Sequence, residues 1–321
     1  QFVVSWMYSQ KLYRQETIVQ LAQDFIFALQ KLIAYCQMPD AGGYTPSDFP
    51  LASLSQMEID RLIGQGKNVA DIYPLSPMQA GMLFHSVYAP ESGVYFIQTG
   101  FEISGKLDVL QFRQAWQAMV DRHTILRTGF VWQNLDQPLQ IVYEKVILPW
   151  DEMDWSGLSS DEQAARLEKL LRDERERGFD LGKAPLTKCT LIHLADNSYQ
   201  FIWHCHHMLT DGWSGQIIFK EVFELYENLS VSLPPARPYR EYIAWLAQQD
   251  MQKAEQFWKK QLAGFTTPTQ LRIAQKQSHP IESHRTYHVQ LSTDLSEQLI
   301  QFARLNHLTL NTLVQGGYAL L

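Results

Sequence analysis

Residues 199–229 contain the pattern that most restricts the fold, an apolar strand followed closely by an amphipathic helix. The stretch from Tyr199 to His207 is rich in β-forming residues and too short for a convincing helix. Apolar residues at helical spacing then predict a helix from about Trp213 to Leu229. A sheet and a helix must therefore meet at the short segment that joins these two elements.

Strand geometry decides which side chains of the stretch share a face, because alternate residues point the same way. His207 then ends an aromatic, mostly apolar row, and partial loss of water there would disfavour the imidazolium form. We expect a neutral ring nitrogen near pH 7 that can accept a proton. The row contains Tyr199, Phe201, Trp203, Cys205 and His207, with Ile202, His204 and His206 on the opposite face.

The residues after the strand are expected to turn the chain into the helix. Gly212 suits this turn because glycine permits a backbone conformation or close approach that a side chain would forbid.

Other interpretations of the histidines stay open. The adjacent His206 and His207 could be core residues whose ring nitrogens have hydrogen-bond partners. His204, Cys205 and their neighbours could also suggest a metal site, but the sequence has no matching second ligand cluster, and we predict none.

Composition bounds the class of protein. Of 321 residues, 45% are hydrophobic and 19% charged, enough for a sizeable core and more than one lobe. A net charge of −7 without a basic run argues against nucleic acid as the main partner. Three widely spaced cysteines favour a reducing cytoplasm over a disulfide scaffold. No signal peptide or membrane-length apolar run is found, so we predict a cytoplasmic protein without a membrane partner.

The first part of the chain separates from the rest by its glycine and proline residues. We predict a strand from Phe2 to Tyr8 and a helix near residues 15–37. Residues 38–61 contain glycine and proline residues in the pattern that is typical of a linker. Neither end of the chain resembles a natural domain boundary, so we expect a piece of a longer protein. No active-site residue is expected before position 60.

Two helix starts are readable in the main region. Ser76 before Pro77 is a favourable N-cap. Asp108 begins a second helix. The buried stripe of that helix is predicted to contain Phe112, Ala115, Trp116, Met119 and Val120.

The second half of the chain adds two simpler predictions. Residues 161–177 form a highly charged helix ended by Gly178 and are expected to lie on the surface. A strand is predicted from Tyr287 to Leu291, followed by two helices.

Two arginines follow the second helix. Arg122 and Arg127 are both compatible with helix-end cations that complement the helix dipole. Arg127 next to a buried acid would instead fix an active-site wall through a bidentate pair.

Four segments, in order, resemble the condensation domains of nonribosomal peptide synthetases, which belong to the chloramphenicol acetyltransferase superfamily. The central one matches the HHxxxDG signature from His206 to Gly212. The others are Ser76-Pro77-Met78-Gln79, the RHxxLRTxF match from Arg122 to Phe130, and the YxDxAxW-like Tyr239 to Trp245, with Glu241 in place of aspartate. The resemblance implies an α/β (α+β) fold: a chloramphenicol-acetyltransferase-like lobe, with a mixed sheet covered by helices, and the start of a second lobe.

The resemblance also implies a domain organisation. Residues 1–37 would be the C-terminal tail of a preceding condensation- or epimerization-type domain, and residues 38–61 a linker. Residues 62–265 would form the N-terminal lobe of a condensation domain. Residues 266–321 would be the truncated start of its C-terminal lobe.

The implied reaction is peptide-bond formation between carrier-bound aminoacyl or peptidyl thioesters. His207 would position or deprotonate the attacking amine, and Asp211 would orient the loop through a salt bridge. Gly212 would supply a backbone amide or room for the thioester arm, and His206 would be structural. The candidate substrate-binding residues are Trp213, Ser214 and Arg127.

The implied partners are upstream and downstream peptidyl carrier domains and an adjacent adenylation domain. The carriers would bring 4′-phosphopantetheine, and the chain itself would hold no cofactor. The residues around His207 resemble the subtype that joins a D-configured donor to an L-configured acceptor. A coenzyme A thioester-dependent acyltransferase and a non-catalytic piece of a synthetase remain as alternatives, and the fragment alone is expected to be inactive.

Overall fold

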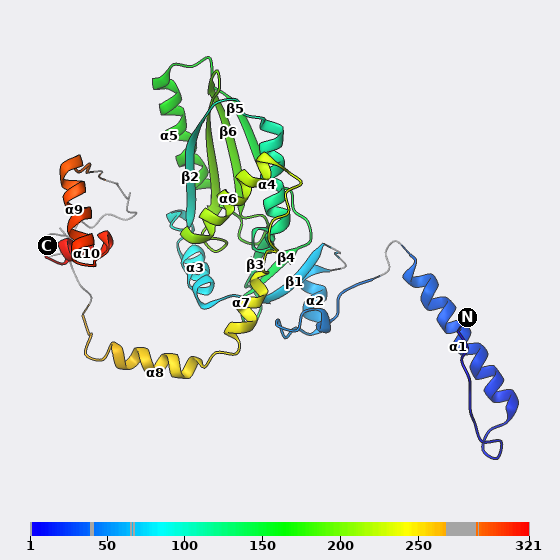
Figure 1. Ribbon diagram of the computed structural model, residues 1–321. Coiled ribbons are helices and arrows are strands. Elements are labelled where there is room, and N and C mark those ends of the chain that lie inside the picture. Colours follow the sequence, from blue (N-terminus) through cyan, green and yellow to red (C-terminus); the bar gives the residue numbers. More distant parts are fainter. Residues whose placement is uncertain are drawn as a thin grey trace. The chain divides into compact units, whose positions relative to one another are not determined.

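The computed structural model describes residues 2–38, 42–64, 66, 68–267, 287 and 289–320 (Figure 1). These residues divide into two units, Gln1–Ala263 and Gly264–Leu321. The strands of the first unit are β1 (Val69–Pro74), β2 (Phe96–Ser104), β3 (Thr128–Val131), β4 (Leu139–Tyr143), β5 (Trp150–Asp154), β6 (Thr187–Ala195) and β7 (Ser198–His206).

Helices account for most of the remaining regular structure. Those of the first unit are α1 (Gln15–Cys36), α2 (Gln56–Ile63), α3 (Pro77–Tyr88), α4 (Val109–Arg122), α5 (Ser160–Arg177), α6 (Gly212–Glu227), α7 (Tyr239–Leu246) and α8 (Met251–Gln261), with short 3₁₀ turns η1 (Pro46–Asp48), η2 (Pro90–Ser92) and η3 (Thr124–Arg127). The second unit contains α9 (Thr293–Leu305) and α10 (Leu310–Ala319).

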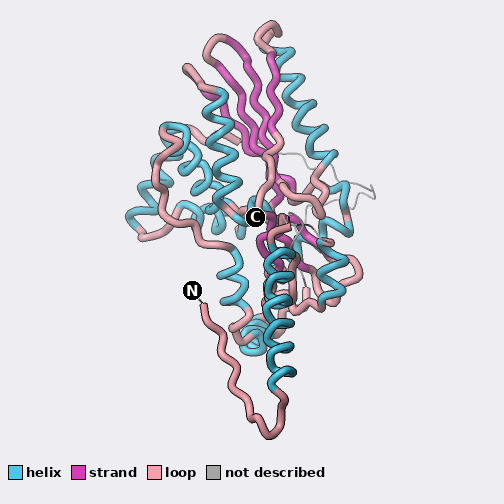
Figure 2. Tube along the Cα trace, turned by 90° about the vertical axis from the view of Figure 1, so that its right-hand side faces the viewer, coloured by secondary structure: helices cyan, strands magenta, loops and turns pink. Residues whose placement is uncertain are grey.

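A four-stranded sheet, ordered β2-β7-β6-β5, places the histidine-rich strand in its interior (Figure 2). β7 pairs antiparallel with β2 and β6, whereas β5 and β6 are parallel. The alternation predicted for this stretch is confirmed. Phe201, Trp203 and Cys205 belong to the main core cluster, and Ile202 packs in a separate cluster on the other face.

The helices α4 and α6 cover the face of the sheet that carries Trp203. The cap at Asp108 is confirmed, because its carboxylate accepts the Gln111 amide at 2.9 Å. The predicted stripe of α4 is buried in full, and Ile218 and Val222 of α6 pack with it. Each of the larger aliphatic and phenylalanine side chains in this set contributes about 1.5–3 kcal/mol on burial. This packing fixes where α6 begins relative to the end of β7.

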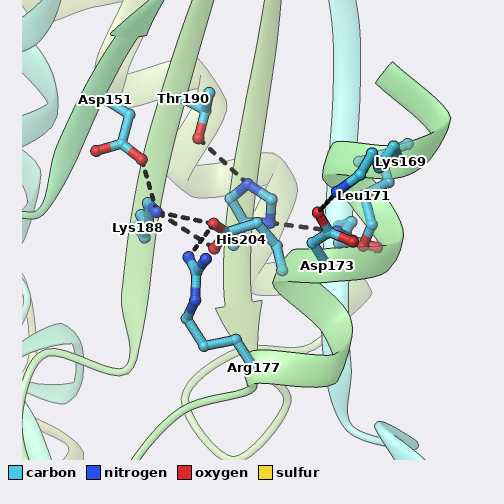
Figure 3. A network of polar contacts seen from close by, with 10 residues as sticks. Asp151, Lys169, Leu171, Asp173, Arg177, Lys188, Thr190 and His204 are labelled. Atoms are coloured by element: carbon cyan, nitrogen blue, oxygen red, sulfur yellow. Dashed lines mark hydrogen bonds and ion pairs between the residues drawn. The ribbon is translucent and has the colours of Figure 1, made fainter. Parts of the chain in front are cut away.

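The helix α5 covers the opposite face of the sheet, through leucines packed on Ile202 and Ile192. It begins and ends as predicted and is mostly exposed, but Glu174 is buried, which the charge pattern did not predict. Lys188 Nζ lies 3.1 Å from the Glu174 carboxylate and 2.7 Å from that of Asp151, and Arg177 also pairs with Glu174 (Figure 3). These cations compensate the buried carboxylate, which would otherwise be costly.

A three-stranded antiparallel sheet, ordered β1-β4-β3, forms a second layer of core. Residues assigned above to the linker contribute to it, because Phe49, Ala52 and Ile59 pack on Ile72 and Ile141. The helix α2 starts at a capping box in which Ser55 and Glu58 bond reciprocally. The mixed α/β class with helix-covered sheets is thus confirmed, with two sheets in place of one.

Two predicted strands are wrong within the described residues. Residues 2–8 are not in a strand, and neither are Tyr287 and 289–291, while His288 lies outside the described residues. A strand is stabilised by the ladder it makes with a neighbour, and the described chain offers none to these segments. The predicted helices fared better: α1 confirms the one near 15–37, and α9 and α10 confirm the last two. None of the helices described here has the length and hydropathy to cross a membrane.

Candidate active site

The loop between β7 and α6 is held by backbone hydrogen bonds on both sides. The His206 amide donates to Leu186 O at 3.0 Å, and the His207 amide donates to Tyr95 O at 2.9 Å. Leu209 N closes a turn onto His206 O at 3.0 Å. The backbone of both histidines is therefore fixed where β7, an interior strand of the sheet, comes to its end.

His207 is half-buried, and its Nδ1 lies 2.6 Å from Thr210 O. A carbonyl oxygen can only accept, so Nδ1 carries the hydrogen of this bond. In the neutral ring, Nε2 then has the free lone pair. The ring of Tyr95 lies edge-on at 6.4 Å between centroids and forms one wall. The arrangement gives His207 a defined orientation and one nitrogen available as a base.

His206 is held differently and is 6% exposed. Its Nδ1 accepts the Met208 amide at 3.2 Å, which leaves Nε2–H to donate to Ser86 Oγ at 3.4 Å. Burial, helped by the charge of His207, lowers the pKa of His206 to about 4. These contacts agree with the structural role expected for this histidine, which is neutral at pH 7.

The other polar residues of the strand give no sign of a second chemistry. His204 is fully buried, with Nδ1 at 3.4 Å from Gln98 Nε2 and Nε2 at 3.4 Å from Thr190 Oγ1. Burial lowers its pKa to about 4 and raises the pKa of the Cys205 thiol to about 12. A thiol with that pKa is protonated and a poor nucleophile at neutral pH. No group of three possible metal ligands occurs among the described residues.

Asp211 is the N-cap of α6. Its Oδ1 accepts from Ser214 N at 2.8 Å, from Trp213 N at 3.1 Å and from Ser214 Oγ at 2.6 Å. Ser214 Oγ in turn accepts from Asp211 N at 2.8 Å, which completes a capping box. These bonds, led by the Ser214 hydroxyl and amide, lower the pKa of Asp211.

The salt bridge implied for Asp211 is not formed by any of the residues that the structure describes. The carboxylate is exposed, and amide and hydroxyl donors of its own helix satisfy it. The predicted substrate-binding hydroxyl of Ser214 is likewise engaged in the capping box.

Gly212 and Trp213 open the first turn of α6. A Cβ on Gly212 would meet no described atom within 4 Å, and its φ is outside the left-handed region, so the prediction that the backbone requires glycine is wrong. Trp213 is 80% exposed. Gly212 thus has open space around its Cα, and the Trp213 side chain is not committed to the core.

Among the residues that the structure describes, no acid pairs with Arg127. It is 8% exposed, and its guanidinium donates to three carbonyl oxygens: to Val120 at 3.1 Å, to Glu144 at 2.6 Å and to Tyr143. No bond joins it to Asp211, although the structure describes both residues. Its contacts tie η3 to the end of β4 and do not support its assignment to substrate binding.

Sequence reasoning missed the acid that fixes the neighbouring Arg122. Glu221 of α6 accepts from Arg122 Nε at 3.0 Å and from His123 Nε2 at 2.8 Å. The arginine-histidine motif after α4 is thereby bound to the helix that begins at Asp211. No local sequence signal links positions so far apart in the chain.

Comparison with known sequences places this site in a family. The sequence model described as "Condensation domain" matches residues 69–321. A linear gramicidin synthase protein of Brevibacillus parabrevis is 43% identical over 100% of this chain and 4% of its own length. Bacitracin synthase 3 of Bacillus licheniformis is 32% identical over 100% of this chain and 5% of its own length. The chain thus spans a small part of the long proteins it resembles.

Solved structures agree on the fold. The starter condensation domain of rhizomide synthetase matches with a TM-score of 0.53 at 23% identity, over 61% of this chain and 49% of that one. A cyclization-docking bidomain from Sorangium cellulosum matches with a TM-score of 0.51 at 20% identity, over 81% of this chain and 50% of that one. The family match, the relatives and the helix-covered sheet agree: the chain belongs to the nonribosomal peptide synthetase condensation domain family.

Proposed function

We propose that this chain provides the base that assists amide-bond formation between two carrier-bound thioester substrates. The observation that carries the proposal is the bond from His207 Nδ1 to Thr210 O, at 2.6 Å, in a member of the condensation family. It leaves Nε2 as the acceptor for a proton, while His206 is neutral and occupied. One histidine of the pair is thus suited to proton transfer and the other to support.

The chemistry needs little more than a base and good placement. The amine of the acceptor substrate attacks the thioester carbon of the donor, and His207 Nε2 takes the proton that the nitrogen loses. The carbon–sulfur bond then breaks, and the leaving thiolate takes this proton from His207 to become the free thiol of the donor arm. Holding the two substrates in attack geometry supplies much of the rate, because the thioester is already activated.

The partners in this proposal are two peptidyl carrier domains and a neighbouring adenylation domain, with 4′-phosphopantetheine as the arm of each carrier. Gly212 and the exposed Trp213 leave room for such an arm. A cavity of about 380 Å³, lined in part by Ser86, Tyr95 and His206, offers further space beside the loop.

We also propose that residues 1–37 belong to the end of a preceding domain and residues 38–61 to a connection, the second half of which packs on the small sheet of the lobe that follows. Residues 62–265 then form the first lobe of the condensation domain, and residues 266–321 begin its second lobe. The family match supports this division because it begins at residue 69, whereas the gramicidin synthase alignment covers the whole chain.

The test is reconstitution of the synthetase that contains this chain, with both carriers loaded. Intact-protein mass spectrometry should show the donor acyl group moved onto the aminoacyl acceptor carrier. Transfer from a coenzyme A thioester, with none from the loaded donor carrier, would favour a coenzyme A-dependent acyltransferase. No transfer from either donor would favour a non-catalytic segment.

The subtype is a finer proposal. The residues around His207 resemble those that follow epimerization domains, so the donor is proposed to have the D configuration and the acceptor the L configuration. Inverting one centre displaces the thioester carbon from attack geometry. Matched D- and L-donor thioesters on the upstream carrier test this, and equal rates or a faster L-donor would contradict it.

A further inference from the structure

Gln79 is a buried polar side chain that joins α3 to the loop after β7. It is 3% exposed, and its Nε2 donates to Met208 O at 3.1 Å. Its Oε1 accepts from Ser76 N at 3.0 Å. The Ser76 amide on one side and the Met208 carbonyl on the other fix the orientation of the Gln79 amide. A flip would place the amide NH₂ against the Ser76 N–H and the amide oxygen against the Met208 oxygen.

A second amide completes the arrangement. Gln140 of β4, which is fully buried, exchanges hydrogen bonds with Gln79 at 3.1 and 3.3 Å and donates to Pro74 O at 2.9 Å. Tyr239 at the start of α7 donates to Ser76 Oγ at 3.2 Å. Segments far apart in the sequence therefore meet at Gln79, and every polar atom of its side chain has a partner.

The choice of glutamine at this position points beyond helix capping. Two other helices begin with a reciprocal box that has a serine at the cap, Ser55 with Glu58 and Ser159 with Glu162, and both use glutamate at the third helical position. Capping needs only the acceptor oxygen. At position 79 the side chain must also donate, because Met208 O faces it, and a carboxylate has no hydrogen to give.

We propose that Gln79 is a positioning residue for His207. Met208 is held at its amide by His206 Nδ1 and at its carbonyl by Gln79 Nε2, so both ends of the residue after His207 are fixed. Thr210 O, which orients the His207 ring, lies two residues further along the same loop. Gln79 thereby sets the position of the loop on which Nε2 is presented. The inference rests on the proposed function of His207.

The test is Gln79→Glu in the synthetase that contains this chain. The variant keeps the acceptor for Ser76 N and loses the donor to Met208 O. We expect kcat for amide formation to fall about 10- to 100-fold at pH 8, since a displaced reacting group costs that much. The KM for the loaded carriers should stay within about twofold.

The pH profile separates positioning from packing. Burial raises the pKa of a carboxyl at this position, and the protonated acid can again donate to Met208 O. The activity of Gln79→Glu relative to the natural enzyme should therefore recover as the pH falls. Imidazole ¹⁵N spectra of His207 should show the Nδ1–H form weakened in the variant at pH 8 and restored at lower pH. The matched control is Glu162→Gln, the reverse exchange in a remote capping box, which should leave kcat unchanged.

Other outcomes overturn the inference. A folded Gln79→Glu enzyme with unchanged kcat at every pH would do so. So would a lowered kcat that does not recover as the pH falls, together with unchanged ¹⁵N spectra of His207. If Gln79→Glu does not fold, Gln79→Met is measured instead, and the proposal expects a lower kcat with a KM that stays within about twofold. If neither variant folds, the role of Gln79 is structural and the proposal is contradicted. A natural enzyme that forms no amide bond would refute the proposed function instead.

Discussion

At the residue scale, the side chains around the candidate site are held by backbone groups more than by charge partners. Asp211 is bonded by amides of its own helix, His207 by a carbonyl and Arg127 by three carbonyls. Bonds of this kind depend on the exact path of the chain. Loss of one of these hydrogen bonds should therefore lower the free energy of unfolding more than it changes the charge interactions of the site.

Asp211→Ala should lower the free energy of unfolding by about 1 kcal/mol, the typical cost of losing an N-cap. Asn caps equally well, so Asp211→Asn should keep most of the stability. Because the folded pKa of Asp211 is lowered, its contribution is complete above the unfolded pKa of about 4 and is lost as the pH falls through the lower folded value. Urea unfolding from pH 7 to pH 2 measures this. Equal stability of the natural chain and Asp211→Ala at pH 7 would contradict the capping role.

Arg127→Lys should lower the free energy of unfolding by about 1–3 kcal/mol, because one ammonium cannot reach the carbonyls that the planar guanidinium serves. The control is Arg113→Lys on the exposed side of α4, which should change little. A melting temperature of Arg127→Lys equal to that of the control would show that the carbonyl contacts contribute nothing.

The sequence could predict which residues gather at this loop but not what each one touches. The histidine pair, Asp211 and the start of α6 follow from local pattern and were placed correctly. The partners of Arg127 lie at Tyr143 and Glu144, and only the folded chain brings them near. The expectation that a side chain could not be accommodated at Gly212 is wrong, because its φ lies outside the left-handed region and the space around it is open.

At the scale of elements, the contact between α4 and α6 fixes where α6 begins, at the end of the loop that follows β7. Glu221 accepts from both Arg122 and His123. It lies two residues after Phe219, the residue of α6 whose ring packs on Trp203. Burial raises the pKa of Glu221, but the bonds from His123 and Arg122 outweigh it and the net shift is downward.

Glu221→Gln should reduce the free energy of unfolding by roughly 1–3 kcal/mol, the range for hydrogen bonds to charged groups. The stabilisation should be present above the unfolded pKa of about 4 and disappear as the pH falls through the lowered folded pKa. The control is Glu224→Gln, whose carboxylate lies at 3.8 Å from Lys220 on the exposed side of the same helix. A double-mutant cycle with Arg122→Met that gives no coupling would rule out the link.

Elements with a strong internal period were predicted best. The stripe of α4 and the alternation of β7 appear as expected, because each is stabilised by burial of one face. The helix α6 buries Ile218, Val222 and Leu225 but ends at Glu227, before the expected Leu229, which is exposed. The predicted strands at residues 2–8 and at 287 and 289–291 are absent from the part of the chain that the structure describes, since a strand depends on a partner that its own sequence does not reveal. The packing of residues 49–59 on the small sheet was hidden by the glycines and prolines that precede it.

At the scale of the whole molecule, the first unit gathers the four family-like segments around one loop. Tyr239 and Ser76 bond to each other, Gln79 bonds to Met208, and Arg122 bonds to α6 through Glu221. Segments read as separate motifs in the sequence are thus parts of one support for His207. The relatives are far longer than this chain, which spans 4% and 5% of the length of two of them.

The measurement that tests the central claim most directly is the rate of amide formation by His207→Ala in the synthetase, with both carriers loaded. If Nε2 of His207 takes the proton, the rate should fall by about 10²–10⁴-fold while the variant unfolds at the same urea concentration as the natural enzyme. His193→Ala, a histidine of β6 paired with Asp154, is the control and should keep the full rate. A His207→Ala enzyme that forms the amide at the natural rate would contradict the claim.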